Sequence, residues 1–150
     1  MSVVQIYTDG GCSGNPGPGA WAYVILAGTE RLEAASAVAA TTNNRMELQA
    51  VISALQAVGR RQDWASAALE IYTDSSYVQK GITQWIRVWE TNGWRTSTKQ
   101  PVKNRELWQE LRSLSARRRI AWRWLAGHAG HTHNEECDRL VRQAIAGLKA

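Results

Sequence analysis

The chain has 150 residues, a length that is typical of one domain able to bury a core without disulfides or metals. Hydrophobic residues make up 44% of the sequence and charged residues 21%, which excludes wholesale disorder, and no run of 18 apolar residues is present to span a membrane. Eighteen lysines and arginines against 13 acidic residues give a net charge of +5, which favours a polyanionic partner such as nucleic acid. We expect residues 1–150 to form a single globular domain.

Two further features concern the cellular compartment. Cys12 and Cys137 are too few for a disulfide framework, and the N-terminus has no basic segment followed by a long apolar one. We therefore expect a cytoplasmic protein with reduced thiols and no membrane association.

The predicted elements alternate between strands and helices. A strand over residues 3–8 ends in a turn at Asp9-Gly10-Gly11, a glycine-rich loop covers 14–19, and two strands over 20–26 and 31–39 form a hairpin. Apolar residues at helical spacing predict a helix over 44–59. The remaining elements are a strand over 69–73, helices over 75–81, 82–92 and 104–113, a strand over 120–125 and a helix over 134–148.

This order predicts an α/β fold with a five-stranded mixed sheet. Right-handed crossovers through helices make strands 1, 4 and 5 parallel neighbours, while the hairpin makes strand 2 antiparallel to strand 1. Ligands of such sheets bind beyond the carboxyl ends of the strands. Asp9 and Asp74 each follow such an end, so we expect them to share a site.

Four carboxylates are candidates for chemistry, and each also has a structural interpretation. Asp9 is followed by glycine, as in a common turn, and Asp74 stands where a helix N-cap is favoured. Glu47 has the spacing of a capping box after Asn44, and Asp138 could be a solvated residue on the last helix.

The four carboxylates are more informative together than singly. Two carboxylates about 4 Å apart repel by roughly 4 kcal/mol at an effective dielectric of 20, so a cluster of them needs a cation. Oxygen-only ligands select hard ions such as Mg²⁺ or Mn²⁺. Two such ions about 3.5–4 Å apart are an arrangement known for phosphodiester cleavage.

Five motifs in this sequence occur in the order and spacing of a known family. They are YTDGGC at 7–12, GNPGPG at 14–19, TTNNRMEL at 41–48, TDSSYV at 73–78, and GHAGH at 127–131 followed by NEECD at 134–138. Over nearly its whole length the chain resembles bacterial type 1 ribonuclease H. The resemblance implies the ribonuclease H-like fold.

The resemblance also implies an activity. A member of this family cuts the RNA strand of an RNA–DNA hybrid with two Mg²⁺ ions, for which Mn²⁺ can substitute, and leaves 5′-phosphate and 3′-hydroxyl ends. Asp9 would bridge both ions, Asp138 would complete the site of the ion that activates water, and Glu47 and Asp74 would hold the ion facing the leaving oxygen. His128 would assist proton transfer or product release. A monomer with no obligate protein partner is expected.

The family's substrate positions carry over to a further set of residues. They are Cys12, Asn15, Thr42, Asn43, Asn44, Ser75, Ser76, Trp85, Arg87 and Trp89. Ser76 is shorter than the amide side chain of the best-known bacterial members. Glu90, Thr91 and Asn92 replace a denser basic run, so we expect weaker and less salt-tolerant binding of the hybrid.

Three alternatives were weighed against this interpretation. His128, His131, His133 and Cys137 suggest zinc superficially, but their spacing fits no usual closed zinc site. A DNA strand transferase of the same fold would need DNA-binding domains for which 150 residues leave no room. A non-catalytic binder of hybrids would gain nothing from carboxylates that repel one another.

Overall fold

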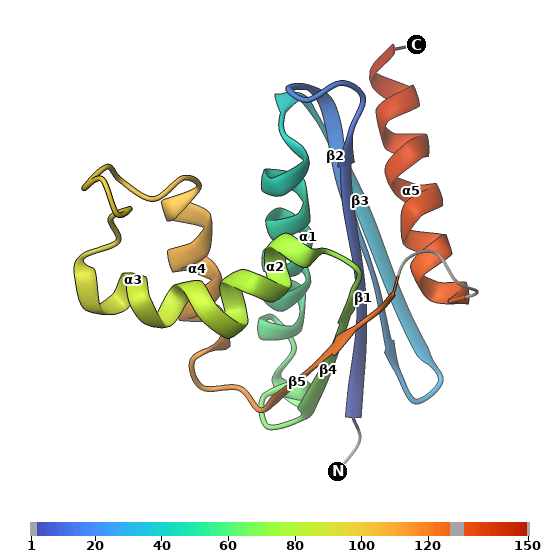
Figure 1. The fold of residues 1–150 in the computed structure, drawn as a ribbon. Coiled ribbons are helices and arrows are strands. Elements are labelled where there is room, and N and C mark those ends of the chain that lie inside the picture. The colour runs from blue at the N-terminus through green and yellow to red at the C-terminus, as the bar shows by residue number, and fades with distance from the viewer. Residues whose placement is uncertain (1–2, 127–130, 150) are drawn as a thin grey trace.

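The computed structural model describes residues 3–126 and 131–149. Its five strands form one sheet in the order β3-β2-β1-β4-β5, shown in Figure 1. The strands are β1 (Val3–Cys12), β2 (Gly17–Ala27), β3 (Glu30–Thr41), β4 (Ala68–Thr73) and β5 (Ile120–Trp124). The helices are α1 (Asn43–Gly59), α2 (Ser76–Lys80), α3 (Ile86–Asn92), α4 (Arg105–Ser115) and α5 (Thr132–Lys149), with short helical segments η1 (Gln62–Trp64) and η2 (Gly81–Trp85).

The sheet has the predicted mixed topology. β1 pairs with β2 and β2 with β3 in antiparallel fashion, whereas β1–β4 and β4–β5 are parallel. The α/β prediction and the parallel grouping of strands 1, 4 and 5 are therefore confirmed. The hairpin strands are longer at both ends than predicted. At the start of β2, glycines that looked like loop residues belong to the strand, and Gly19 pairs with Cys12 of β1.

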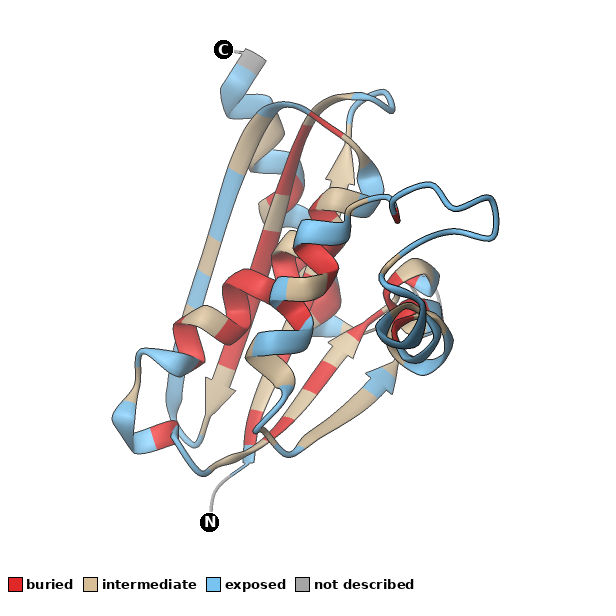
Figure 2. Ribbon diagram, turned by 90° about the vertical axis from the view of Figure 1, so that its left-hand side faces the viewer, coloured by how far each residue is buried: buried red, intermediate tan, exposed pale blue. Residues whose placement is uncertain are grey.

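Two apolar layers hold the sheet between helices. On one face, Val4 and Ile6 of β1 pack with Leu48 and Ile52 of α1 in the larger core. On the other face, a smaller cluster joins the alanines and Val24 of β2 to α5. Figure 2 shows buried residues concentrated along α1 and the central strands. No helix within the described residues is long and apolar enough to cross a membrane.

The helical region after β4 differs from the prediction in one respect. The chain stays helical from α2 through η2, a π-helical segment, into α3, whereas the sequence predicted two helices meeting at Gly81. Gly81 is buried against Trp108 of α4, and a Cβ atom there would overlap the indole ring. The glycine therefore allows close packing against α4 rather than ending a helix.

Candidate metal centre

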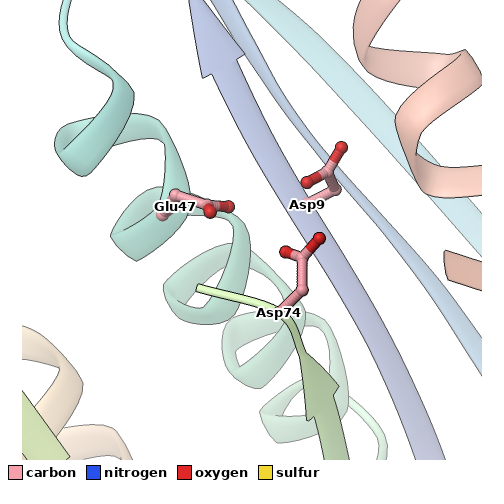
Figure 3. A group of neighbouring side chains, drawn as sticks. All are labelled: Asp9, Glu47 and Asp74. Carbon is pink, nitrogen blue, oxygen red and sulfur yellow. The ribbon is translucent and has the colours of Figure 1, made fainter. Parts of the chain in front are cut away.

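Three carboxylates from three elements converge at one point of the sheet. Asp9 lies on β1, Glu47 on α1, and Asp74 directly follows β4. One carboxylate oxygen from each residue lies within 4.8 Å of the others. Figure 3 shows the three side chains directed toward a common space. The predicted meeting of Asp9 and Asp74 is thus observed, and Glu47 joins them.

Asp9 is not at the end of a strand, and the predicted turn at Asp9-Gly10-Gly11 is wrong. β1 continues to Cys12 because β2 keeps pairing with it, with Asp9 opposite Ala22. On the other side, the parallel ladder with β4 stops at Tyr7 and Tyr72. Asp9 therefore lies on a rigid strand, beyond the last residue of β1 that pairs with β4. Asp74 faces the space where that pairing has ended.

Gly10 brings α1 close to β1. A Cβ atom at this position would overlap the backbone of Met46 and Glu47. Because glycine lacks that atom, the first turns of α1 pack directly on the strand beside Asp9. The close approach places the Glu47 carboxyl next to that of Asp9.

The structural interpretations of Asp74 and Glu47 are both wrong. Ser75 is the N-cap of α2, with its hydroxyl accepting a hydrogen bond from the Val78 amide at 3.1 Å, so Asp74 is not a cap. Thr42 is the N-cap of α1 and accepts from the Arg45 amide at 3.3 Å. Glu47 lies too far along the helix for a capping box with Thr42.

Burial and mutual repulsion make two of the three carboxylates poor acids. Burial, followed by the charges of Asp74 and Asp138, raises the pKa of Asp9 to about 7, although a hydrogen bond from the Gly10 backbone opposes the shift. Burial raises the pKa of Glu47 well above its usual range, with the charges of Asp9 and Asp74 adding to the effect. A hydrogen bond from Ser75 to Glu47 works in the opposite direction.

The donor set fits a hard divalent cation. In the part of the chain that the structure describes, no lysine or arginine forms an ion pair with Asp9, Glu47 or Asp74. Among the described residues, the negative charge that the cluster carries when ionised is therefore not neutralised by a lysine or arginine side chain. Oxygen ligands alone match the preference of Mg²⁺ or Mn²⁺, and a bound dication would remove the penalty that raises the two pKa values.

Asp138 lies outside the group of three but close to it. Its charge contributes to the raised pKa of Asp9, which indicates that the two carboxylates are neighbours. One Asp138 oxygen forms an ion pair with Nε of Arg142 at 3.0 Å, one helical turn further along α5. Arg142 was not among the predicted residues, although an aspartate and an arginine four residues apart on a helix are a recognisable pair. The predicted His128 lies outside the described residues.

Two residues of the zinc alternative, Cys137 and His133, have other partners. Cys137 is buried and its thiol donates to the Tyr7 carbonyl at 3.4 Å. Nδ1 of His133 lies 2.6 Å from a carboxylate oxygen of Glu136. Within residues 3–126 and 131–149, Asp9, Glu47 and Asp74 form the group of side chains that could hold a metal ion, and neither Cys137 nor His133 belongs to it.

Several predicted substrate residues gather at the N-terminus of α1. The Asn15 side-chain oxygen accepts from the Asn43 amide at 3.2 Å, which joins the β1–β2 loop to the helix that Thr42 caps. Asn43 and Asn44 are exposed. Cys12 is partly buried and donates to the Gly17 carbonyl.

The two predicted serine contacts differ in environment. Ser75 is buried, caps α2 and hydrogen-bonds to Glu47, so its hydroxyl is already engaged within the protein. Ser76 is exposed on the first turn of α2. The structure therefore gives Ser75 a role in the acidic site and leaves Ser76 open to solvent.

The tryptophans of α3 and η2 belong partly to the core. Trp85 and Trp89 are partly buried and lie 5.7 Å apart between ring centroids, and both contact the fully buried Trp108. Arg87 between them is exposed. Glu90 pairs with Arg112 of α4 at 3.1 Å, so the acidic residue in this helix anchors it to its neighbour.

Comparisons with known proteins identify the family. The RNase H family model matches residues 1–146. The chain is 49% identical to the ribonuclease H of Paramagnetospirillum magneticum over 149 residues, covering 99% of this chain and 93% of the relative. The chain belongs to the ribonuclease H family. It is an enzyme of the ribonuclease H class, and the resemblance noted from its motifs is confirmed.

Solved ribonuclease H structures share the fold. The crystal structure of LC9-RNase H1, a type 1 RNase H with the type 2 active-site motif, has a TM-score of 0.86 and 32% identity, covering 98% of this chain and 74% of that one. LC11-RNase H1 in complex with an RNA/DNA hybrid has a TM-score of 0.75 at 24% identity, covering 98% and 99%. The second likeness concerns the fold alone.

Proposed function

We propose that this ribonuclease H is a metal-dependent endonuclease that hydrolyses the RNA strand of RNA–DNA hybrids to 5′-phosphate and 3′-hydroxyl products. The observation that carries the proposal is the convergence of Asp9, Glu47 and Asp74 without a neutralising side-chain cation among the described residues. Membership of the ribonuclease H family supports the substrate class.

The four acidic residues would hold two Mg²⁺ ions, with Mn²⁺ able to substitute. Asp9 would contribute to both positions, Asp138 to one, and Glu47 and Asp74 to the other. When bound, the ions supply a lowered pKa for the attacking water and neutralise charge on the leaving 3′ oxygen. The rigid strands beneath Asp9 and Asp74 fix the ligand oxygens in advance, which favours an in-line geometry at the phosphate.

Other residues would recognise the hybrid. Asn15, Asn43 and Asn44 at the N-terminus of α1, together with the exposed Ser76 of α2, would bond 2′-hydroxyls and bases in the minor groove. Thr42 would contact a DNA phosphate. Arg87, beside the partly buried Trp85 and Trp89, would contact the nucleic-acid backbone.

We further propose that His128 assists proton transfer or product release and that the protein works as a cytoplasmic monomer, with residues 1–150 as one domain. The near-neutral pKa of an ordinary histidine suits proton traffic. The family membership supports these assignments.

A metal-titrated cleavage assay tests the proposed function. Labelled RNA–DNA hybrid should be cut in Mg²⁺ or Mn²⁺, with EDTA abolishing cleavage and with double-stranded RNA and DNA left intact. Asp9→Asn should lower the rate by several orders of magnitude, because it removes a ligand common to both ions. Cleavage of the hybrid by Asp9→Asn at the wild-type rate would falsify the proposal.

A further inference from the structure

A string of side-chain contacts joins four elements beside the acidic site. It runs from Arg31 of β3 through Glu136 and His133 of α5 to Tyr7 of β1 and Tyr72 of β4. None of these five residues belongs to the group of converging carboxylates or to the predicted substrate contacts. The string nevertheless links β1, β4 and α5, the three elements that place Asp9, Asp74 and Asp138.

The α5 end of the string is a two-sided clamp on Glu136. The Arg31 guanidinium donates to both carboxylate oxygens of Glu136, at 2.8 and 3.4 Å. His133, one helical turn before Glu136, places Nδ1 at 2.6 Å from one of those oxygens. A bidentate arginine–carboxylate pair has a defined geometry, so the clamp fixes the first turns of α5 relative to β3.

The strand end of the string is aromatic. The His133 ring lies 4.9 Å from the Tyr7 ring, and Tyr7 stacks on Tyr72 at 4.4 Å with an interplanar angle of 10°. Tyr7 precedes Asp9 by two residues and Tyr72 precedes Asp74 by two. Because residues two apart in a strand project from the same face, Tyr7 lies on the face of β1 from which Asp9 projects, and Tyr72 lies near the end of β4 that leads into Asp74.

We infer that His133 is a positioning residue, which by bridging Glu136 and Tyr7 holds the first turns of α5 against β1 and so sets the location of Asp138 relative to Asp9. The inference rests on the proposed function. Asp138 follows Glu136 by two residues and the buried Cys137 by one, so a rotation of this part of α5 moves its carboxylate directly.

The expected effect falls on the rate rather than on folding. Partly exposed ion pairs contribute only about 0–1 kcal/mol to stability, so losing this one should hardly change the melting temperature. A misplacement of about 1 Å at a catalytic group can lower the rate by roughly two orders of magnitude. His133→Ala should accordingly lower kcat on the hybrid by about tenfold or more and change KM by less than about twofold.

Conservative variants separate the two contacts of His133. His133→Phe keeps a ring on Tyr7 but loses the bond to Glu136, whereas His133→Gln keeps a polar partner for Glu136 but loses the ring. Each should recover part of the lost kcat. Glu136→Gln should lower kcat in the same way, and the matched control Glu135→Gln, at an exposed position of the same turn, should not.

A double-mutant comparison with Asp138 distinguishes the two ways in which His133 could affect the rate. A positioning role acts through Asp138, whereas a general effect on the site does not depend on it. In the Asp138→Asn background, measured with excess enzyme in single turnovers, His133→Ala should cause no further loss. In an amide NMR spectrum, His133→Ala should shift the signals of residues 137–139 while the melting temperature stays within about 2 °C of wild type.

The inference and the proposed function fail in different ways. If the wild-type protein does not cut the hybrid, the proposed function is wrong. If the wild-type protein cuts it and His133→Ala has an unchanged kcat, or if the loss is equally large in the Asp138→Asn background, the positioning role is wrong.

Discussion

Asp9 combines a rigid backbone position in a strand with a strongly raised side-chain pKa. Its position inside β1 makes its backbone rigid, while the end of the β4 ladder at Tyr7 leaves its side chain facing Asp74 and Glu47. A carboxyl whose pKa is raised to about 7 is partly protonated at neutral pH. The metal-free site therefore titrates in the range where the enzyme would work.

The raised pKa of Asp9 predicts how the stability of the metal-free protein depends on pH. The pKa of about 7 in the native state exceeds the ordinary value of 3.8, so the native state binds the proton more tightly than the unfolded state. This stabilisation is complete below about pH 4 and is lost as the pH rises through about 7. In EDTA, the melting temperature of wild type should fall more steeply than that of Asp9→Asn between about pH 5 and pH 8.5.

Thermal unfolding followed by circular dichroism measures this difference. Asp63→Asn serves as a control, because the pKa of that exposed carboxyl is lowered by Arg61 and its titration ends below this range. Parallel pH dependence of wild type and Asp9→Asn would show that the Asp9 pKa is not raised.

The convergence of two site residues was predictable from the sequence, because the order of the strands determines where these residues lie. The parallel pairing of β1 with β4 ends at Tyr7 and Tyr72, and Asp9 and Asp74 both follow that end, so their meeting followed from the element order even though β1 itself continues. The bond from Ser75 to Glu47 joins two elements, so it depends on side-chain rotamers and on how α1 packs beside the start of α2. Those quantities are set by tertiary packing, and local sequence does not encode them.

At the scale of elements, α2 begins beside the acidic site and shares Ser75 with it. The hydroxyl of Ser75 caps the helix through Val78 and also bonds to Glu47. The start of α2 and the hydrogen bonding of Glu47 therefore depend on the same buried hydroxyl.

Ser75→Ala should affect both stability and activity. Loss of the cap costs about 1 kcal/mol of unfolding free energy, and Glu47 loses a hydrogen bond that favours its ionised form. We expect a lower melting temperature and a higher Mg²⁺ concentration for half-maximal cleavage. Ser76→Ala, at the exposed neighbouring position, should leave the melting temperature unchanged. Equal melting temperatures for the two variants would contradict the capping role.

Element boundaries were predicted best where one face is apolar. The helix expected over 44–59 is α1 with one added residue, because its apolar spacing and Gly59 define it locally. β1 and β2 were predicted too short, since their glycines resemble turn residues. Gly11 and Gly19 remain in the ladder because each strand supplies the partner for the other, which is a non-local cause.

At the scale of the whole molecule, the acidic site is a local negative cluster in a chain of net charge +5. A dication that binds the folded site but not the unfolded chain stabilises the fold by mass action. At a Mg²⁺ concentration about 100 times Kd, the gain is about 2.7 kcal/mol, or roughly 5–10 °C for a domain of this size.

Metal-dependent stabilisation can be measured without substrate. Adding Mg²⁺ to the EDTA-treated protein should raise the melting temperature of wild type and have little effect on Asp74→Asn. Glu70→Gln removes a carboxyl of β4 that is paired with Arg123 outside the cluster, and it should retain the full Mg²⁺ response. Equal responses from all three proteins would place the bound Mg²⁺ elsewhere.

The positive excess of the remaining surface predicts a salt-dependent affinity for the hybrid. Each phosphate that an arginine neutralises contributes about 0.9 to the slope of log K against log salt concentration. If exposed Arg87 contacts the backbone, Arg87→Gln in an Asp74→Asn background should weaken binding and reduce that slope by about one. Arg60→Gln removes an exposed arginine at the C-cap of α1 and should leave the slope unchanged. Fluorescence anisotropy of labelled hybrid at several salt concentrations gives the slope for each variant. If Arg87→Gln and Arg60→Gln have equal slopes, Arg87 does not belong to the binding surface.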